Sequence, residues 1–333
     1  MIELLVIGLF VAALSAALLL VIGVIVGLVY GRFYWDGQEY TGTYMRPGLR
    51  SWSGWRLLHR YFDIRIEEHE SFKRMDVRQH NILYVVYPHG FVPVHMYVGV
   101  LLHAGHPRLS RLAENAFIGA ASFLFVLPGY RELCMAMGLV DVSAKHLRTF
   151  LDERKKLHRP THLAISPGGL REMIRTRMGC DDFYLGHRGF LDFAEREQFD
   201  YVVPIYVDGA TDAFLQSSKL FRVRDWMVTH LRVPAPFMVL PVPLPGSATI
   251  HVGEPVAVSS SAGATATKRP RTAEHTVSRL GHGDSLKRRF AGSFFDVICK
   301  STKDKSHMRL WQDRDTFSDL DKITADDVAN VFE

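Results

Sequence analysis

The chain has 333 residues and 47% of them are hydrophobic, which is enough for one large α/β domain with additions or for two average domains, and we favour one domain. The 40 Lys and Arg exceed the 35 Asp and Glu by a net charge of +5, a small and scattered excess that argues against a nucleic-acid-binding protein and suits an anionic membrane surface or a phosphate-bearing ligand. Cys134, Cys180 and Cys299 have no paired spacing, which predicts free thiols in a reducing compartment and neither a disulfide framework nor a zinc site.

The N-terminal segment is predicted to be a transmembrane anchor. Residues 4–30 carry no charge, and as a helix they would extend about 40 Å, which exceeds the ~30 Å hydrocarbon core of a bilayer. A cleaved signal peptide is the alternative, but it has a basic leader and a shorter apolar stretch. Arginines follow the span and none precedes it, which predicts a cytosolic C-terminal part. We expect residues 1–31 to form a single-pass anchor and residues 32–80, rich in Trp and Tyr, a membrane-proximal amphipathic connector.

The segment after this connector combines a strand with a turn that contains a histidine. The apolar run from Ile82 to Tyr87 predicts a β-strand, and Pro88, His89 and Gly90 follow it as a turn. A histidine whose direction is set by the backbone at a strand end is well placed to take a proton from an attacking hydroxyl. A histidine in an ordinary surface turn is the alternative. His89 is therefore the first catalytic candidate.

Strand-like and helical segments alternate through residues 81–258, which favours an α/β domain with a mixed sheet and flanking helices. The apolar run from Ala116 to Leu127 is too short to span a membrane, so it is either a buried element or a membrane-dipping one. The proline-rich segment Val233–Pro245 predicts an extended loop. Beyond the domain we expect a disordered basic insertion at residues 259–289 and a helical tail at 290–333. Further strands are expected near residues 96–102, 139–142, 161–166 and 201–207, and a helix over 144–158.

Three polar side chains elsewhere are further candidates. Glu172 lies just beyond the turn that contains Gly168 and Gly169, and this glycine pair permits a close approach of a ligand. Arg131 and Arg188 offer guanidinium groups that can bind phosphates bidentately. A surface glutamate and structural salt bridges are the alternative interpretations. The 16 histidines show no metal-ligand spacing, so no metal site is predicted.

Six segments together carry a family resemblance: Tyr87–Gly90, Pro128–Val142, Ser166–Met173, His187–Ala194, Val203–Gly209 and Ile250–Val256. In this order and at these spacings they resemble the type-2 diacylglycerol acyltransferase family, which includes monoacylglycerol and wax-ester acyltransferases and is related to the glycerolipid acyltransferase superfamily. The resemblance covers about residues 80–258 and implies a glycerolipid-acyltransferase-like mixed sheet. The family commonly has two membrane-embedded N-terminal segments, whereas this chain shows one clear span.

The resemblance implies a membrane-bound O-acyltransferase that moves a fatty acyl group from acyl-CoA to the hydroxyl of a neutral lipid. Diacylglycerol is the first expected acceptor, to give triacylglycerol, and monoacylglycerol and fatty alcohols are others. Acyl-CoA would be a co-substrate, and no further cofactor is implied. The expected location is the endoplasmic reticulum membrane or the lipid-droplet surface, with the catalytic domain on the cytosolic face. Self-association stays open.

The resemblance also assigns roles to the candidate residues. His89 would be the general base, and Glu172 is its candidate partner because Val94 occupies the position of the acid that the wider superfamily uses. Backbone N–H groups near Gly90, or near Gly168 and Gly169, would stabilise the oxyanion, Tyr87 and Pro88 would shape the turn, and Arg131 and Arg188 would contact acyl-CoA. The alternatives are a lysophospholipid or glycerol-phosphate acyltransferase and an inactive membrane-anchored lipid-binding protein.

Overall fold

The computed structural model describes residues 2–34, 36–93, 115–187, 189–215, 221–231, 242–258, 286–300, 308–311 and 317–319. Several expectations lie outside these residues. They are the strand near 96–102, the position of Val94, the guanidinium of Arg188, most of the proline-rich segment, most of the insertion and most of the tail.

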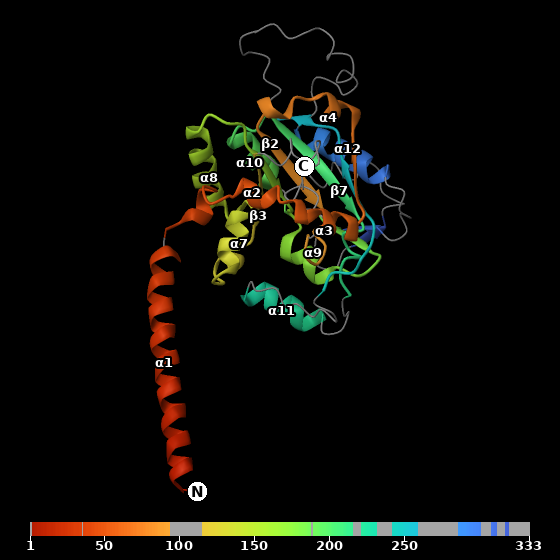
Figure 1. The fold of residues 1–333 in the computed structure, drawn as a ribbon. Helices are drawn as coiled ribbons and strands as arrows, with labels where there is room; N and C mark the ends of the chain where they lie inside the picture. Colours follow the sequence, from red (N-terminus) through yellow and green to blue (C-terminus); the bar gives the residue numbers. More distant parts are fainter. Residues whose placement is uncertain are drawn as a thin grey trace.

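The first helix is long and apolar, as the sequence predicts. Helix α1 spans Ile2–Tyr34, and its window Leu14–Arg32 is long and apolar enough to cross a membrane. None of that window is buried against the protein. In Figure 1 the helix extends away from the rest of the molecule. A helix that is apolar all round and has no protein cover is typical of a membrane span.

The central sheet is mixed and has eight strands, seven of which follow each other in the order β1-β8-β7-β2-β5-β3-β4, while β9 pairs with β7. The run β7-β2-β5-β3-β4 is parallel throughout. Strands β8 and β9 run antiparallel to β7, and β1 runs parallel to β8. The strands are β1 Ile64–Glu68, β2 Ile82–Tyr87, β3 Ala116–Ala120, β4 Leu139–Asp141, β5 His162–Ile165, β7 Tyr201–Asp208, β8 Ala248–Val252 and β9 Val256–Ala257.

Helices cover both faces of this sheet, and this explains why β2 is apolar along its whole length. Leu83, Val85 and Tyr87 of β2 pack into one core with α8, α10 and α12, and the alternate residues pack into a second core with α4 and α7. The helices are α4 Glu70–Arg74, α7 Tyr130–Ala136, α8 Ala144–Lys156, α10 Gly189–Arg196 and α12 Leu286–Cys299.

Shorter elements surround the sheet. A second, three-stranded sheet has the order β11-β10-β6, and α11 packs against α9. These elements are β6 Asp181–Tyr184, β10 Met308–Trp311, β11 Phe317–Asp319, α2 Pro47–Arg50, α3 Arg56–Tyr61, α9 Gly169–Arg175, α11 Phe221–Leu231 and the 3₁₀ turns η1 Gln38–Tyr40, η2 Ser53–Trp55, η3 Val77–Gln79 and η5 Ser122–Phe125.

The structure differs from the sequence prediction outside the central strands. Residues 32–80 contain β1, which joins the main sheet because its alternating Ile64 and Ile66 pair with the edge of β8. Helix α12 begins at Leu286, inside the segment expected to be a disordered insertion, and the tail contributes strands β10 and β11 as well as a helix. The apolar run from Ala116 divides into the buried strand β3 and the turn η5.

Candidate functional site

The turns that follow β2 and β5 lie side by side at one edge of the sheet. The two strands are parallel neighbours in which Val85 pairs with Ile165, so their carboxyl ends meet at the same edge. Ser166 ties the turns together, because its hydroxyl donates a hydrogen bond of 2.9 Å to the carbonyl of Val86. The carboxyl edge of parallel strands is where α/β folds commonly bind their ligands. His89 and the Gly168–Gly169 turn therefore share one candidate site.

Nδ1 of the His89 ring is bonded within the turn, and Nε2 has no hydrogen-bond partner among the residues that the structure describes. Nδ1 lies 3.0 Å from the carbonyl oxygen of Gly90, and because a carbonyl can only accept, Nδ1 carries the proton. Nε2 is then the basic nitrogen of the neutral ring. Burial lowers the pKa of His89 below its usual 6.5, while the bond to Gly90 opposes that shift. The ring is partly exposed, so the neutral Nε2 can act as a base toward a ligand at this edge.

Glu172 holds the backbone of His89 and does not contact its ring. The carboxylate is buried, with 1% exposure. Oε2 accepts a 2.6 Å hydrogen bond from the backbone N–H of His89, and Oε1 accepts a 2.7 Å bond from the backbone N–H of Tyr184. Burial raises the pKa of Glu172 to about 8, with the nearby carboxylates Asp182 and Asp181 adding to the rise and the two N–H bonds opposing it. We had expected Glu172 to be the hydrogen-bond partner of the His89 imidazole. In the structure its carboxylate instead bonds to the His89 backbone and so positions the turn.

The glycines of both turns are required by close contacts. A Cβ on Gly168 would lie 1.9 Å from Cδ of Glu172, so the carboxylate reaches His89 only because residue 168 has no side chain. Gly90 has φ of +67° and would place a Cβ 2.8 Å from the carbonyl oxygen of Ala210. Gly169 also has positive φ, and its N–H already donates to Ser166. Of the predicted oxyanion donors, the N–H groups of Gly90 and Gly168 donate to no residue that the structure describes.

Tyr87 and Pro88 support the turn from the interior. Both are buried, and the Tyr87 ring packs against Phe183 and Phe294 in the core between the sheet and α12. The Tyr87–Pro88 peptide is cis. Burial raises the pKa of the Tyr87 hydroxyl well above its usual value, with a contribution from Glu172. The two residues therefore pack beneath the turn that carries His89.

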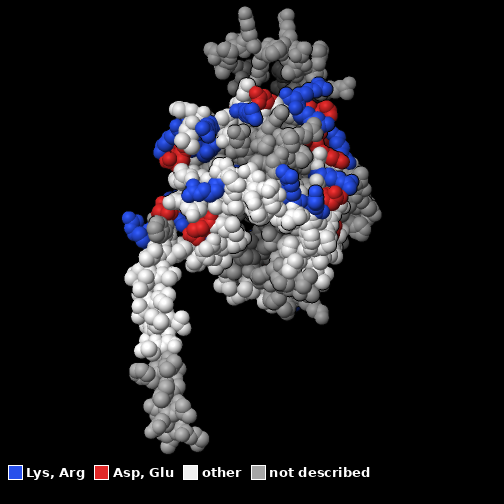
Figure 2. All heavy atoms as spheres, viewed as in Figure 1, with Lys and Arg blue, Asp and Glu red and all other residues white. Residues whose placement is uncertain are grey.

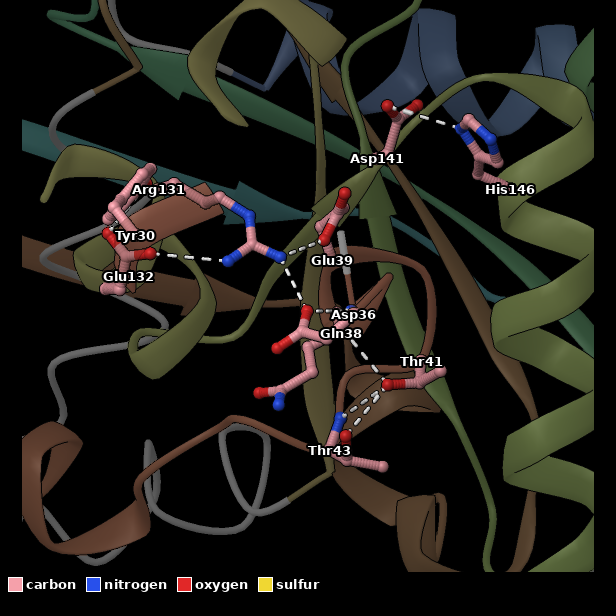
Figure 3. A network of polar contacts seen from close by, with 10 residues as sticks. All are labelled: Tyr30, Asp36, Gln38, Glu39, Thr41, Thr43, Arg131, Glu132, Asp141 and His146. Atoms are coloured by element: carbon pink, nitrogen blue, oxygen red, sulfur yellow. Dashed lines mark hydrogen bonds and ion pairs between the residues drawn. The ribbon is translucent and has the colours of Figure 1, made fainter. Parts of the chain in front are cut away.

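Arg131 is occupied by a structural network and is not available as a ligand clamp. Its guanidinium is 1% exposed and forms ion pairs with Asp36 at 2.8 Å, Glu39 at 2.5 Å and Glu132 at 3.3 Å (Figure 3). A buried cation needs such compensating partners. The structure thus favours the salt-bridge alternative for this arginine over an acyl-CoA contact. The partner acids Asp36 and Glu39 come from the segment just after α1, which the sequence pattern did not connect to residue 131.

Arg171 is a cation beside the site that the sequence analysis did not single out. Its Cζ lies 5.4 Å from the centroid of the Tyr184 ring, and the centroid of the His187 ring lies 5.0 Å from that of Tyr184. Burial and the positive charge of Arg171 lower the pKa of His187. No carboxylate in the described part of the chain pairs with Arg171. The feature of the sequence that could have identified Arg171 is its position directly before Glu172, just after the turn that contains Gly168 and Gly169.

Comparison with known proteins identifies the family of the chain. The family model described as diacylglycerol acyltransferase matches residues 13–268, which is most of the chain. The chain belongs to the diacylglycerol acyltransferase family. The resemblance stated from the motifs is confirmed, and so is the mixed α/β fold preceded by one apolar helix, which the structure itself shows.

The curated relatives of this family member are distant. Human diacylglycerol O-acyltransferase 2-like protein 6 is 25% identical over 195 residues, which cover 58% of this chain and 55% of that protein. Diacylglycerol O-acyltransferase 2 of Dictyostelium discoideum is 22% identical over 195 residues, covering 58% of this chain and 56% of the relative. The match thus spans a little more than half the length of these relatives. Among solved structures, the 1-acyl-sn-glycerophosphate acyltransferase PlsC of Thermotoga maritima is similar with a TM-score of 0.35 and 17% identity over 63% of this chain and 68% of that one.

Proposed function

We propose that this member of the diacylglycerol acyltransferase family is a membrane-bound O-acyltransferase that uses acyl-CoA and a neutral lipid acceptor, diacylglycerol first among them. The observation that carries the proposal is the state of His89. Its ring is neutral, its Nδ1 is bonded to Gly90, and its Nε2 is available at the carboxyl edge of the central strand β2. Helix α1 supplies the anchor, and the arginines after it support a cytosolic catalytic domain. The endoplasmic reticulum membrane and the lipid-droplet surface both suit this topology.

The proposed reaction needs one base and one oxyanion site. Nε2 of His89 takes the proton from the acceptor hydroxyl as its oxygen attacks the thioester carbonyl of acyl-CoA, and a C–O bond forms. Backbone N–H groups of Gly90 or Gly168 stabilise the negative charge on the carbonyl oxygen. The C–S bond then breaks, and the thiolate of coenzyme A receives the proton from the His89 imidazolium. The ester product and the free thiol leave, and the ring is neutral again.

The acceptor class is tested by an acceptor profile of the full-length protein in membranes. Labelled acyl-CoA is supplied with diacylglycerol, monoacylglycerol, a fatty alcohol or lysophosphatidate in separate reactions, and the labelled lipids are separated. We expect labelled triacylglycerol to be the main product. Predominant labelling of lysophosphatidate would instead support the phospholipid-precursor alternative. Lack of product with every acceptor, from protein that is folded, would support the inactive lipid-binding alternative.

The two arginines near the site are expected to give different phenotypes. We assign to Arg171 a contact with a phosphate of acyl-CoA, because it lies beside the site and no carboxylate that the structure describes pairs with it. Arg171→Ala should then raise the KM for acyl-CoA about tenfold, because the phosphate loses a charge-assisted hydrogen bond. Arg131→Ala should leave that KM unchanged but lower the free energy of unfolding by about 3–5 kcal/mol, because three carboxylates lose their buried cation. Steady-state kinetics and denaturant unfolding measure the two effects. Arg65→Ala, which removes an exposed ion pair with Asp63, is the control and should change neither quantity appreciably.

The pH dependence of the reaction should follow the His89 ring. A general base must be neutral, and burial places the pKa of His89 below 6.5. We therefore expect kcat/KM to fall as the pH decreases through this lowered pKa, whereas a change near pH 8 would report on Glu172, whose pKa burial raises to about 8. The measurement is a pH profile of kcat/KM with saturating acceptor lipid. An acid limb above pH 6.5 would show that a different group, or a differently placed His89, controls the rate.

A further inference from the structure

The network around Arg131 joins the end of α1 directly to α7. The hydroxyl of Tyr30, near the end of α1, lies 3.3 Å from Oε2 of Glu132, and Cζ of Arg131 lies 5.2 Å from the ring centroid of Tyr34. Asp36, just after the helix, pairs with the same guanidinium (Figure 3). Since the apolar window of α1 ends at Arg32, α7 is held at the level where this helix would leave a bilayer.

The segment that joins η5 to α7, and helix α7 itself, present large apolar side chains to solvent at this same level. The exposed fractions are 59% for Val126, 53% for Leu127, 46% for Tyr130 and 50% for Leu133. We call these four residues the η5–α7 surface. They are neighbours in sequence of Arg131 and Glu132, so the network that binds the end of α1 also fixes the position of this surface.

The η5–α7 surface belongs to the same edge of the sheet as His89. The chain enters η5 directly from the carboxyl end of β3, and β3 is separated from β2 only by β5, to which both are parallel. Helix α11 packs on α9 of the site and exposes Val223, Trp226 and Leu231. Figure 1 shows α7, α9 and α11 on the side of the domain from which α1 extends.

The distribution of charged side chains also distinguishes this side of the domain from the opposite side. In the view of Figure 2 the described Lys, Arg, Asp and Glu side chains gather mainly on the half of the domain away from the free end of α1. The described atoms on the half toward that end are mostly uncharged. Exposed apolar side chains next to a membrane span, with charged side chains gathered away from them, are typical of a face that enters the lipid interface.

We propose that the η5–α7 surface inserts into the bilayer interface beside α1, so that the edge bearing His89 faces the lipid. This inference rests on the proposed role of α1 as a membrane anchor. Interfacial elements of this kind bury their apolar face about 5–10 Å into the boundary between headgroups and acyl chains. An apolar acceptor could then reach Nε2 of His89 from the bilayer without crossing water, while the charged half of the domain stays in the aqueous phase.

Lipid-quenching fluorescence on the full-length protein in nanodiscs tests this orientation. In a background with Cys134→Ala, Cys180→Ser and Cys299→Ser, single cysteines carry an environment-sensitive dye at Leu127→Cys or at Leu133→Cys. Leu157→Cys is the matched control, because Leu157 is also 55% exposed but lies just before β5, at the opposite edge of the sheet. Leu20→Cys, in the exposed window of α1, reports on the anchor itself. Each protein is measured in ordinary lipids and in lipids with brominated acyl chains.

We expect brominated lipids to reduce the fluorescence at residues 127 and 133 by about half or more, and to leave the dye at residue 157 unchanged. The dye at residue 20 should be quenched as well. Quenching at residue 20 without quenching at 127 and 133 would overturn the docking surface and leave the anchor intact. Absence of quenching at residue 20 would overturn the anchor and this inference together. A thermal transition that matches the parent protein shows that each labelled variant is folded.

Discussion

Replacement of His89 by alanine is expected to lower the acyl-transfer rate by about 10²- to 10⁴-fold, the range that a positioned general base contributes. The structure gives the reason, because the neutral ring presents Nε2 at the carboxyl edge of β2 while Nδ1 is bonded to Gly90. The measurement is the rate of labelled triacylglycerol formation from acyl-CoA and diacylglycerol in membranes that contain equal amounts of each protein. The binding of acyl-CoA should change little, because the ring acts on the acceptor hydroxyl.

His80→Ala is the matched control for this experiment. His80 lies just before β2, at the opposite edge of the sheet, and its ring is 3.9 Å from the exposed carboxylate of Asp200. Its loss should leave the rate within about twofold of the parent, since such a partly exposed pair contributes little. Equal rates for the parent and the His89→Ala protein would remove His89 from the mechanism and with it the proposed chemistry.

The second large effect is expected at Glu172. At a pH above the raised pKa of about 8 Glu172 is a carboxylate, and in the Glu172→Gln protein one of its acceptor oxygens is replaced by an NH₂ group, which faces a backbone N–H that also donates. One buried donor, on His89 or on Tyr184, then lacks an acceptor, at a cost of about 1–3 kcal/mol in the free energy of unfolding. The His89 turn shifts in consequence, and a displacement of about 1 Å at a reacting group can lower kcat about a hundredfold. Denaturant unfolding and single-turnover kinetics measure the two changes.

A pH profile separates this positioning role from direct assistance to the imidazole. Because the Glu172 carboxylate bonds to the backbone of His89 and not to its ring, the acid limb of kcat/KM should stay at the same pH in the Glu172→Gln protein, even though the rate is lower. A shift of that limb toward lower pH would mean that the carboxylate had been stabilising the protonated ring. Glu195→Gln, an exposed change on α10, is the control and should alter neither the unfolding nor the profile.

Local sequence patterns were sufficient to predict the helices and strands on which the family assignment depends. The uncharged run before Arg32 predicts α1, because length and composition alone decide whether a helix can cross a bilayer. The strand Ile82–Tyr87 and the turn that follows it were readable because an apolar run next to Pro and Gly is a short-range signal. Leu139–Asp141, the helix from Ala144, His162–Ile165 and Tyr201–Asp208 were recognised in the same way.

Only the tertiary structure decided what the polar side chains do. Glu172 meets the His89 backbone across 83 positions of sequence, and Arg131 meets Asp36 and Glu39 across 95 and 92. Contacts between residues so far apart in the sequence depend on strand order and on the packing of loops at the sheet edge. No local periodicity of the sequence encodes these. The sequence by itself therefore determined an α/β acyltransferase-family chain with one long apolar N-terminal helix and a histidine at a strand end. Folding decided that Glu172 holds the turn and not the ring, that Arg131 binds carboxylates and not a ligand, and that β1 belongs to the sheet.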